Sequence, residues 1–250
     1  MTEPAGYALA AGAALLAGAV NAIAGGGSLI TFPALVAGGL SAVTASVTNT
    51  IAMCPGYLGA TLAQRRDLTG QRRRMAILLP AGALGGVAGA ALLLHTGEAA
   101  FKQVVPYLIL FAALLLAIQD PLRRWLLARA PGGHAEAWAA LPIGLAAIYG
   151  GYFGAGLGVM LLAALAVVVG DSLTRLNAIK QAVSLAVNVA AAGVFVFSDQ
   201  VDWPVAGVML VASLAGGVLG GLVASRIPPA VLRWTVVTLA VVVAAIYLVR

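Results

Sequence analysis

Residues 21–28 of the chain are NAIAGGGS, and this glycine tract lies within a stretch, residues 4–64, that contains no Asp, Glu, Lys or Arg. A membrane-spanning helix needs about 20 apolar residues, so the stretch is long enough for more than two crossings. Of all 250 residues, 62% are hydrophobic and 9% are charged, whereas a soluble domain carries roughly 25% charged residues. The apolar segments do not alternate as barrel strands do. We therefore predict an all-α integral membrane protein.

Charged residues, proline and glycine divide the chain into eight apolar segments. They run near residues 7–39, 41–63, 75–95, 101–119, 138–169, 173–197, 204–224 and 230–248. The first and the fifth are too long for one crossing, and glycines interrupt both, at residues 21–28 and at residues 149–158, YGGYFGAGLG. Paired glycine-interrupted segments at corresponding positions are a sequence signal for the binding site of a transporter.

The two broken segments open two related halves. A shift of 128 residues lays Gly26 on Gly154, Ser28 on Gly156 and Asn49 on Asn177. We predict a single membrane domain over residues 1–250. Its parts are repeat 1 at about 7–119, repeat 2 at about 138–248, and a basic cytoplasmic loop at 120–137.

The charges between segments predict the topology. Loop 64–74 holds five arginines, which the positive-inside rule assigns to the cytoplasm. If the fifth segment crosses once, the acidic residues 198–202 are cytoplasmic and Arg226 and Arg233 lie outside, against the rule. If it enters and returns, or crosses twice, both placements agree with the rule. The second topology makes the halves inverted repeats. It also accounts for the net charge of +6 without nucleic-acid binding.

Several stretches carry a resemblance to a known family. They are NAIAGGGSLITFPAL (21–35), TASVTNTIAMCPGYLGA (44–60), YGGYFGAGLGVMLLAAL (149–165), LNAIKQAVSLAVNVAAA (176–192), VDWPVAG (201–207) and GGVLGGLVASRIPPAVLRW (216–234). With these, the chain resembles the sulfite exporter TauE/SafE family of membrane transporters. The resemblance implies a polytopic helical bundle of two related halves. It also implies movement of small anions, sulfite or organosulfonates, across the cytoplasmic membrane.

The broken segments have the chemistry to bind an anion. A helix that restarts after glycine in mid-membrane presents free N–H groups with partial positive charge. We expect such a site at Gly25, Gly26, Gly27, Ser28, Gly154 and Gly156, with Asn21 lining the same cavity. The alternative is close helix packing through small residues, which is common in membranes.

The sixth segment has one polar face. Asn177, Gln181, Ser184 and Asn188 recur at spacings of 4, 3 and 4, and Lys180 borders them. These side chains can hydrogen-bond an oxyanion and add positive charge. Alternatively the amides join helices and Lys180 extends to the membrane surface. Asn49 is the first-half counterpart of Asn177 under the 128-residue shift. We expect Arg175, nearer the helix end, to be an interfacial anchor.

The mechanism that these residues favour is secondary transport or uniport by alternating access, with no cofactor. No Asp or Glu lies well inside an apolar segment, there is no P-loop, and neither histidine lies within a span. We therefore expect neither a carboxylate proton relay nor an intramembrane enzyme. The expected partners are membrane lipid and a small anion, and the sequence leaves open whether the chain forms a homo-oligomer.

The alternative function is a non-transporting scaffold or assembly factor, with a dry, packed interior. A cavity at the glycine breaks, lined by Asn177 and Asn188, would argue against it.

Overall fold

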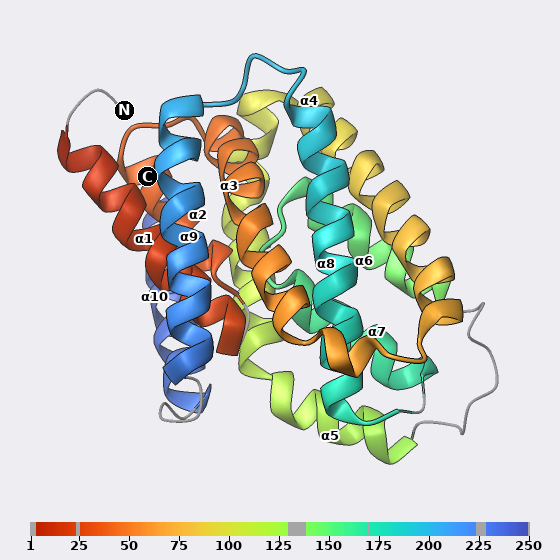
Figure 1. Cartoon of the computed structure of the whole chain (residues 1–250). Coiled ribbons are helices and arrows are strands. Elements are labelled where there is room, and N and C mark those ends of the chain that lie inside the picture. Colours follow the sequence, from red (N-terminus) through yellow and green to blue (C-terminus); the bar gives the residue numbers. More distant parts are fainter. Residues whose placement is uncertain (1–3, 24–25, 130–138, 170, 224–228, 250) are drawn as a thin grey trace.

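The computed structural model describes residues 4–23, 26–129, 139–169, 171–223 and 229–249, which form helices and turns without a strand among them (Figure 1). The helices are α1 (Pro4–Ile23), α2 (Ser28–Ala37), α3 (Ala42–Ala63), the 3₁₀ helix η1 (Arg65–Leu68), α4 (Arg72–Ala117), α5 (Gln119–Arg129), α6 (Ala140–Tyr152), α7 (Leu157–Val168), α8 (Leu173–Phe195), α9 (Trp203–Val223) and α10 (Pro229–Val249). The predicted all-α helical bundle is confirmed.

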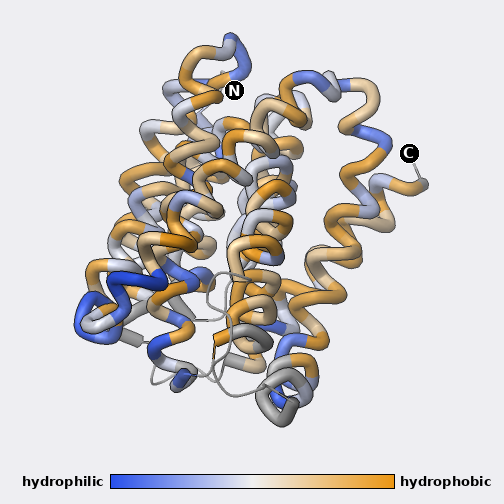
Figure 2. Tube along the Cα trace, turned by 90° about the vertical axis from the view of Figure 1, so that its right-hand side faces the viewer, coloured by the Kyte–Doolittle hydropathy of each residue, from blue (hydrophilic) through white to orange (hydrophobic). Residues whose placement is uncertain are grey.

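Four helices in the described part of the chain are long and apolar enough to cross a membrane. These candidate spans are Pro4–Asn21, Arg72–Ala117, Thr174–Phe195 and Trp203–Gly220. Large apolar side chains on the outside of the bundle remain exposed, among them Leu84, Leu141 and Val211. Hydrophilic residues gather at the two ends of the bundle (Figure 2). An exposed apolar surface of this extent suits lipid rather than water.

α4 contains the third and fourth predicted segments in one run of helix. Gly97 interrupts it with φ 72° and ψ 167°, a conformation that favours glycine. The two parts of α4 run in opposite directions (Figure 1). The prediction of a loop at 120–137 is wrong for its first part. Residues 119–129 form α5, which packs on α7. Residues 130–138 of that predicted loop lie outside the described residues.

The bundle has two ends that we name for their contacts. At the basic end, which holds η1 and its arginines, the start of α4 meets the start of α8 through Arg74 and Asp171. At the distal end, the carboxylate of Glu98, beside the Gly97 break, accepts hydrogen bonds from the backbone N–H groups of Ala42 and Val43 at the start of α3. α3 therefore runs from the distal to the basic end, and α8 runs the opposite way.

The two glycine-broken segments are hairpins that enter from opposite ends. α1 lies parallel to α9, with Leu15 against Gly216 and Ala19 against Gly220, and α2 returns to the distal end, where α3 begins. α6 rises along the first part of α4 from the basic end, and α7 returns there, where α8 begins. Both hairpins therefore have their glycine tips inside the bundle.

Glycines let each hairpin approach its neighbour at backbone distance. A Cβ at Gly89 of α4 would lie 2.0 Å from the carbonyl oxygen of Ile148 in α6, and a Cβ at Gly216 of α9 would lie 2.0 Å from that of Leu15 in α1. The central pair is α3 and α8, which contact each other, and they also contact α9 and α4, respectively. The same pattern of neighbours therefore recurs in both halves.

The close approach at Gly89 predicts a stability difference between two Gly→Ala changes. Gly89→Ala should destabilise the protein by about 1–3 kcal/mol, because the added methyl group meets the backbone of α6 and the helices must separate. Gly193→Ala in α8 is the matched control, since its added Cβ would meet no atom within 4 Å beyond its chain neighbours and its own helix backbone. Thermal unfolding of purified protein in detergent measures both. Equal midpoints for the two variants would contradict this account of the α4–α6 contact.

Candidate functional site

Both glycine tips adopt backbone conformations that side chains disfavour. Gly26 has φ +88°, and Gly154 and Gly156 both have φ +79°. Gly27 is the N-cap of α2, and Gly156 is the N-cap of α7. Non-glycine residues rarely adopt this left-handed conformation, so glycine here allows the chain to turn tightly and start a new helix. Each tip therefore presents a helix N-terminus, with its partial positive charge, inside the bundle.

The two tips line one small cavity. Its lining residues are Asn21, Gly26, Gly27, Ser28, Tyr57, Gly154, Gly156, Leu157, Gly158, Lys180, Gln181 and Ser184. The cavity volume that the centre of a water molecule can occupy is about 10 Å³. That is room for roughly one water molecule. The residues come from both halves of the chain, so the cavity lies where the halves meet.

Lys180 is the charged side chain of the cavity lining. It is 8% exposed and lies over Gly158, where an added Cβ would be 3.6 Å from its Cδ and 3.9 Å from its Nζ. Within the described part of the chain, no carboxylate forms an ion pair with it. Lys180 therefore stays at the cavity instead of extending to the membrane surface.

Two neighbours of Lys180 on α8 present polar atoms that lack a protein partner. Gln181 is 2% exposed and Ser184 is fully buried, and neither the Gln181 Nε2 nor the Ser184 Oγ makes a hydrogen bond to the described residues. Leaving such a group unpaired costs about 1–3 kcal/mol. An unpaired amide and hydroxyl beside a lysine can donate to the oxygens of an anion.

Two asparagines hold the start of α2 in place. The backbone N–H of Gly27 donates to Asn21 Oδ1 at 2.8 Å. Asn49 on α3 donates through Nδ2 to Ser28 Oγ at 3.2 Å and accepts from Thr31 Oγ1 at 2.5 Å. Asn21 thus lines the cavity, whereas Asn49 lies behind it and positions Ser28.

Asn49 and Lys180 occupy matching places on α3 and α8. Their helices begin at the N-cap residues Ser41 and Ser172, and each residue is the eighth after its cap. Both contact the start of the short helix in their own half, at Ser28 and at Gly158. Counted from the caps, the shift between halves at these helices is 131 residues, so Lys180 rather than Asn177 corresponds to Asn49.

The remaining residues of the predicted site lie elsewhere. Asn177 donates through Nδ2 to Gln64 Oε1 at 2.8 Å and does not line the cavity. Asn188 donates to the Ser184 carbonyl of its own helix at 2.8 Å. Gly25 lies outside the described residues. We expected a cavity at the glycine breaks to distinguish a transporter from a scaffold. The structure has a cavity that reaches the glycine breaks, but Lys180, Gln181 and Ser184 line it instead of Asn177 and Asn188.

Tyr57, Leu157 and Gly158 line the cavity without having been predicted. A signal for Tyr57 existed, because it lies eight residues after Asn49 and therefore on the same face of α3. Gly158 belongs to the second glycine tract, as its last residue.

Aromatic rings lie between the cavity and the distal end. Phe153, directly before Gly154, packs edge-on against Phe32 of α2 with ring centroids 5.3 Å apart. Phe101 of α4 packs against both rings at 6.4 and 6.3 Å. These T-shaped contacts are favourable and fill space tightly. They form an apolar wall on that side of the site.

Comparison with known proteins matches this chain over both halves. The family described as sulfite exporter TauE/SafE matches residues 10–247. A "Probable membrane transporter protein YfcA" of Escherichia coli K12 is 28% identical over 217 residues, 83% of this chain and 76% of that protein. A "Probable membrane transporter protein" of Haemophilus influenzae is 30% identical over 206 residues, 80% of this chain and 78% of that protein.

The unpaired hydroxyl of Ser184 predicts an unusual response to mutation. Ser184→Ala should leave the unfolding midpoint unchanged or raise it, because the change removes a buried polar group that has no protein partner. The matched control is Ser213→Ala in α9, also fully buried, whose Oγ donates to the Ala52 carbonyl of α3 at 2.8 Å. That change should cost about 1 kcal/mol. Thermal unfolding in detergent compares them. A loss at Ser184 as large as at Ser213 would show that Ser184 has a structural role.

Proposed function

Because the chain belongs to the sulfite exporter TauE/SafE family, we propose that it transports small anions, such as sulfite or organosulfonates, through the cavity between its two glycine tips. The multi-pass helical fold and the family place it among membrane transporters. The substrate class, the binding residues and the mechanism are the content of the proposal.

The observation that carries the proposal is the chemistry of α8 at the cavity. Lys180 supplies a positive charge, and the unpaired Gln181 Nε2 and Ser184 Oγ supply hydrogen-bond donors on the same helix face. The N-termini of α2 and α7 each add roughly half a positive charge. No Asp or Glu belongs to the cavity lining among the described residues. The electrostatic field of this site therefore favours an anion.

The small size of the cavity supports a mechanism of alternating access. Sulfite has four heavy atoms and an organosulfonate has more, while the cavity has room for roughly one water molecule. The described conformation is thus closed around the site, and substrate entry requires the surrounding helices to move apart. The two hairpins enter from opposite ends with matching neighbours, which supports an inverted-repeat relation between residues 7–119 and 138–248.

The arginines support the proposed orientation in the cytoplasmic membrane. Arg65, Arg66, Arg72, Arg73 and Arg74 lie at the basic end, which the positive-inside rule assigns to the cytoplasm. A membrane potential that is negative inside then drives an anion outward with about 2.3 kcal/mol per charge per 100 mV. Export of an anion can therefore proceed without a coupled ion.

Lys180→Gln tests the proposal directly. In proteoliposomes with an imposed potential, this change should lower uptake of sulfite and of small sulfonates by roughly ten- to a hundredfold, because a charge-assisted hydrogen bond is worth about 1.5–3 kcal/mol. Lys102→Gln, at an exposed lysine near the distal end, is the control and should transport at the normal rate.

Two outcomes would contradict different parts of the proposal. Normal transport by Lys180→Gln would mean that the cavity is not the binding site. Absence of potential-dependent flux for sulfite, sulfate and a series of sulfonates in the unaltered protein would refute anion transport and favour the scaffold alternative.

A further inference from the structure

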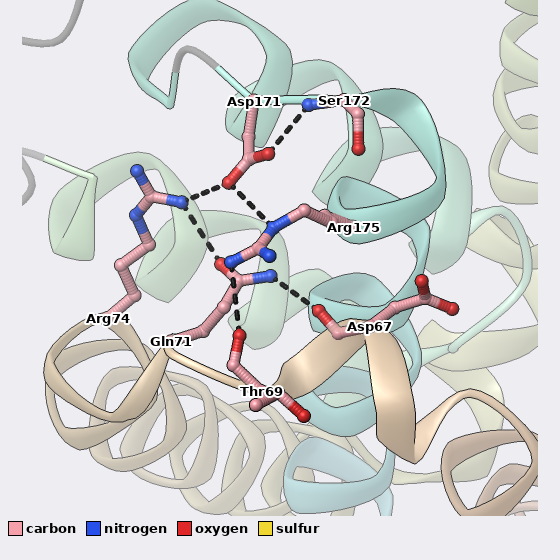
Figure 3. Close-up of polar contacts among 7 residues, drawn as sticks. All are labelled: Asp67, Thr69, Gln71, Arg74, Asp171, Ser172 and Arg175. Atoms are coloured by element: carbon pink, nitrogen blue, oxygen red, sulfur yellow. Dashed lines mark hydrogen bonds and ion pairs between the residues drawn. The ribbon is translucent and has the colours of Figure 1, made fainter.

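Three contacts join residues 64–74 to the start of α8 at the basic end. Arg74 Nη1 donates to Asp171 Oδ2 at 2.5 Å, Arg175 Nη2 donates to the Thr69 carbonyl at 3.2 Å, and Asn177 Nδ2 donates to Gln64 Oε1 at 2.8 Å. Figure 3 shows the first two of these contacts around Asp171. We name this set the basic clasp: Gln64, Thr69 and Arg74 on one side, and Asp171, Arg175 and Asn177 on the other. Arg175, expected as a membrane anchor, thus has protein partners.

The basic clasp lies close to the cavity along α3 and α8. Asn177 is three residues, less than one helical turn, before Lys180 on α8, and Gln64 follows the end of α3, seven residues after Tyr57. Two of the helices that line the cavity, α3 and α8, are therefore joined on its basic side. The partners pair in opposite chain order along the start of α8, from Arg74 with Asp171 to Gln64 with Asn177.

Asp171 is the centre of the clasp. It accepts from Arg74, from Arg175 Nε at 3.1 Å and from the Ser172 backbone N–H at 2.7 Å. Partial burial alone would raise the pKa of Asp171, but these three donors outweigh it and lower the pKa below its usual value of 3.8. The carboxylate therefore stays ionised at neutral pH. With side-chain exposures of 21% for Arg74 and 16% for Asp171, the pair is shielded more than a surface ion pair.

A second, neutral set of contacts joins the halves at the distal end. Thr44 Oγ1 donates to Gln200 Oε1 at 3.2 Å, and the Asp202 backbone N–H donates to Thr48 Oγ1 at 3.1 Å. We name these four residues the distal clasp. Thr44 is the third residue after the Ser41 cap, and Arg175 is the third after the Ser172 cap. The two clasps therefore use the same position on α3 and α8, at opposite ends of the bundle.

We propose that the basic clasp and the distal clasp are the two gates of the cavity, and that the protein exposes the cavity at one end by opening the clasp at that end. The assignment of the cavity as the transport site rests on the proposed function. The basic gate contains ion pairs, and the distal gate contains the hydrogen bonds of Thr44 and Thr48.

The test places a single reactive thiol in the cavity. Ser184→Cys provides it, in a chain whose native Cys54 is replaced by serine. A membrane-impermeant maleimide is then added from one side at a time to vesicles of known protein orientation. We expect Asp171→Asn to speed labelling from the basic end by roughly tenfold, since losing a charge-assisted contact shifts a two-state equilibrium by about that factor. Labelling from the distal end should not speed up.

Matched variants make the result specific. Arg72→Gln removes an exposed arginine outside the clasp at the same end and should leave both labelling rates unchanged. Asn177→Leu breaks the basic clasp without touching its ion pairs and should also speed labelling from the basic end. Thr44→Val should speed labelling from the distal end only. Thermal unfolding midpoints establish that each variant is folded.

Unchanged labelling from the basic end in both folded variants, Asp171→Asn and Asn177→Leu, would overturn the gate assignment. Faster labelling from both ends in either one would also overturn it, because the clasp would then only hold the bundle together. The measurement needs no substrate. If anion transport in proteoliposomes failed, the proposed function would be wrong, and the labelling rates would still decide whether the clasps are gates.

Discussion

Inside a lipid bilayer every backbone N–H and C=O group must find its partner within the protein, and the breaks in the two hairpins depend on this constraint. Broken helices can exist here only in the interior, where side chains supply the missing partners. Asn21 accepts from the Gly27 N–H, and Asn49 positions Ser28. The cost of interrupting a helix in the membrane thus fixes where the tips lie. Both tips line the cavity together with residues of α3 and α8, so the place of the cavity and of its lysine depends on the same constraint.

The membrane class and most of the cavity lining could be predicted from the sequence. Charge-poor segments define helices, and glycine tracts too long for one crossing define the breaks. Helical periodicity gave the polar face of α8 but not its depth, which is why Asn177 was expected at the site although it pairs with Gln64 at its edge. Asn188 satisfies its own helix instead. The hydrogen-bond partner of each amide depends on which residues the fold places beside it. The helix at 119–129 was missed because its charged residues indicated a loop.

The two halves share a backbone plan but carry different chemistry. At the eighth position after the cap, one half has a neutral amide that bonds the side chains of Ser28 and Thr31, and the other has a lysine at the cavity. The clasps differ in the same sense, with ion pairs at one end and neutral hydrogen bonds at the other. The two halves thus have matching helix neighbours but unequal side chains at the cavity and at the two ends of the bundle.

The glycine contacts of the hairpins have a mechanical consequence. Where Gly89 faces Ile148 and Gly216 faces Leu15, backbone meets backbone, and no long side chains interlock at those points. Interlocked side chains resist sliding, because each must change rotamer before its helix can advance. A backbone contact has no interlocked side chains at these points. A movement of either hairpin along its long helix would therefore need fewer rotamer changes there than an interlocked contact would.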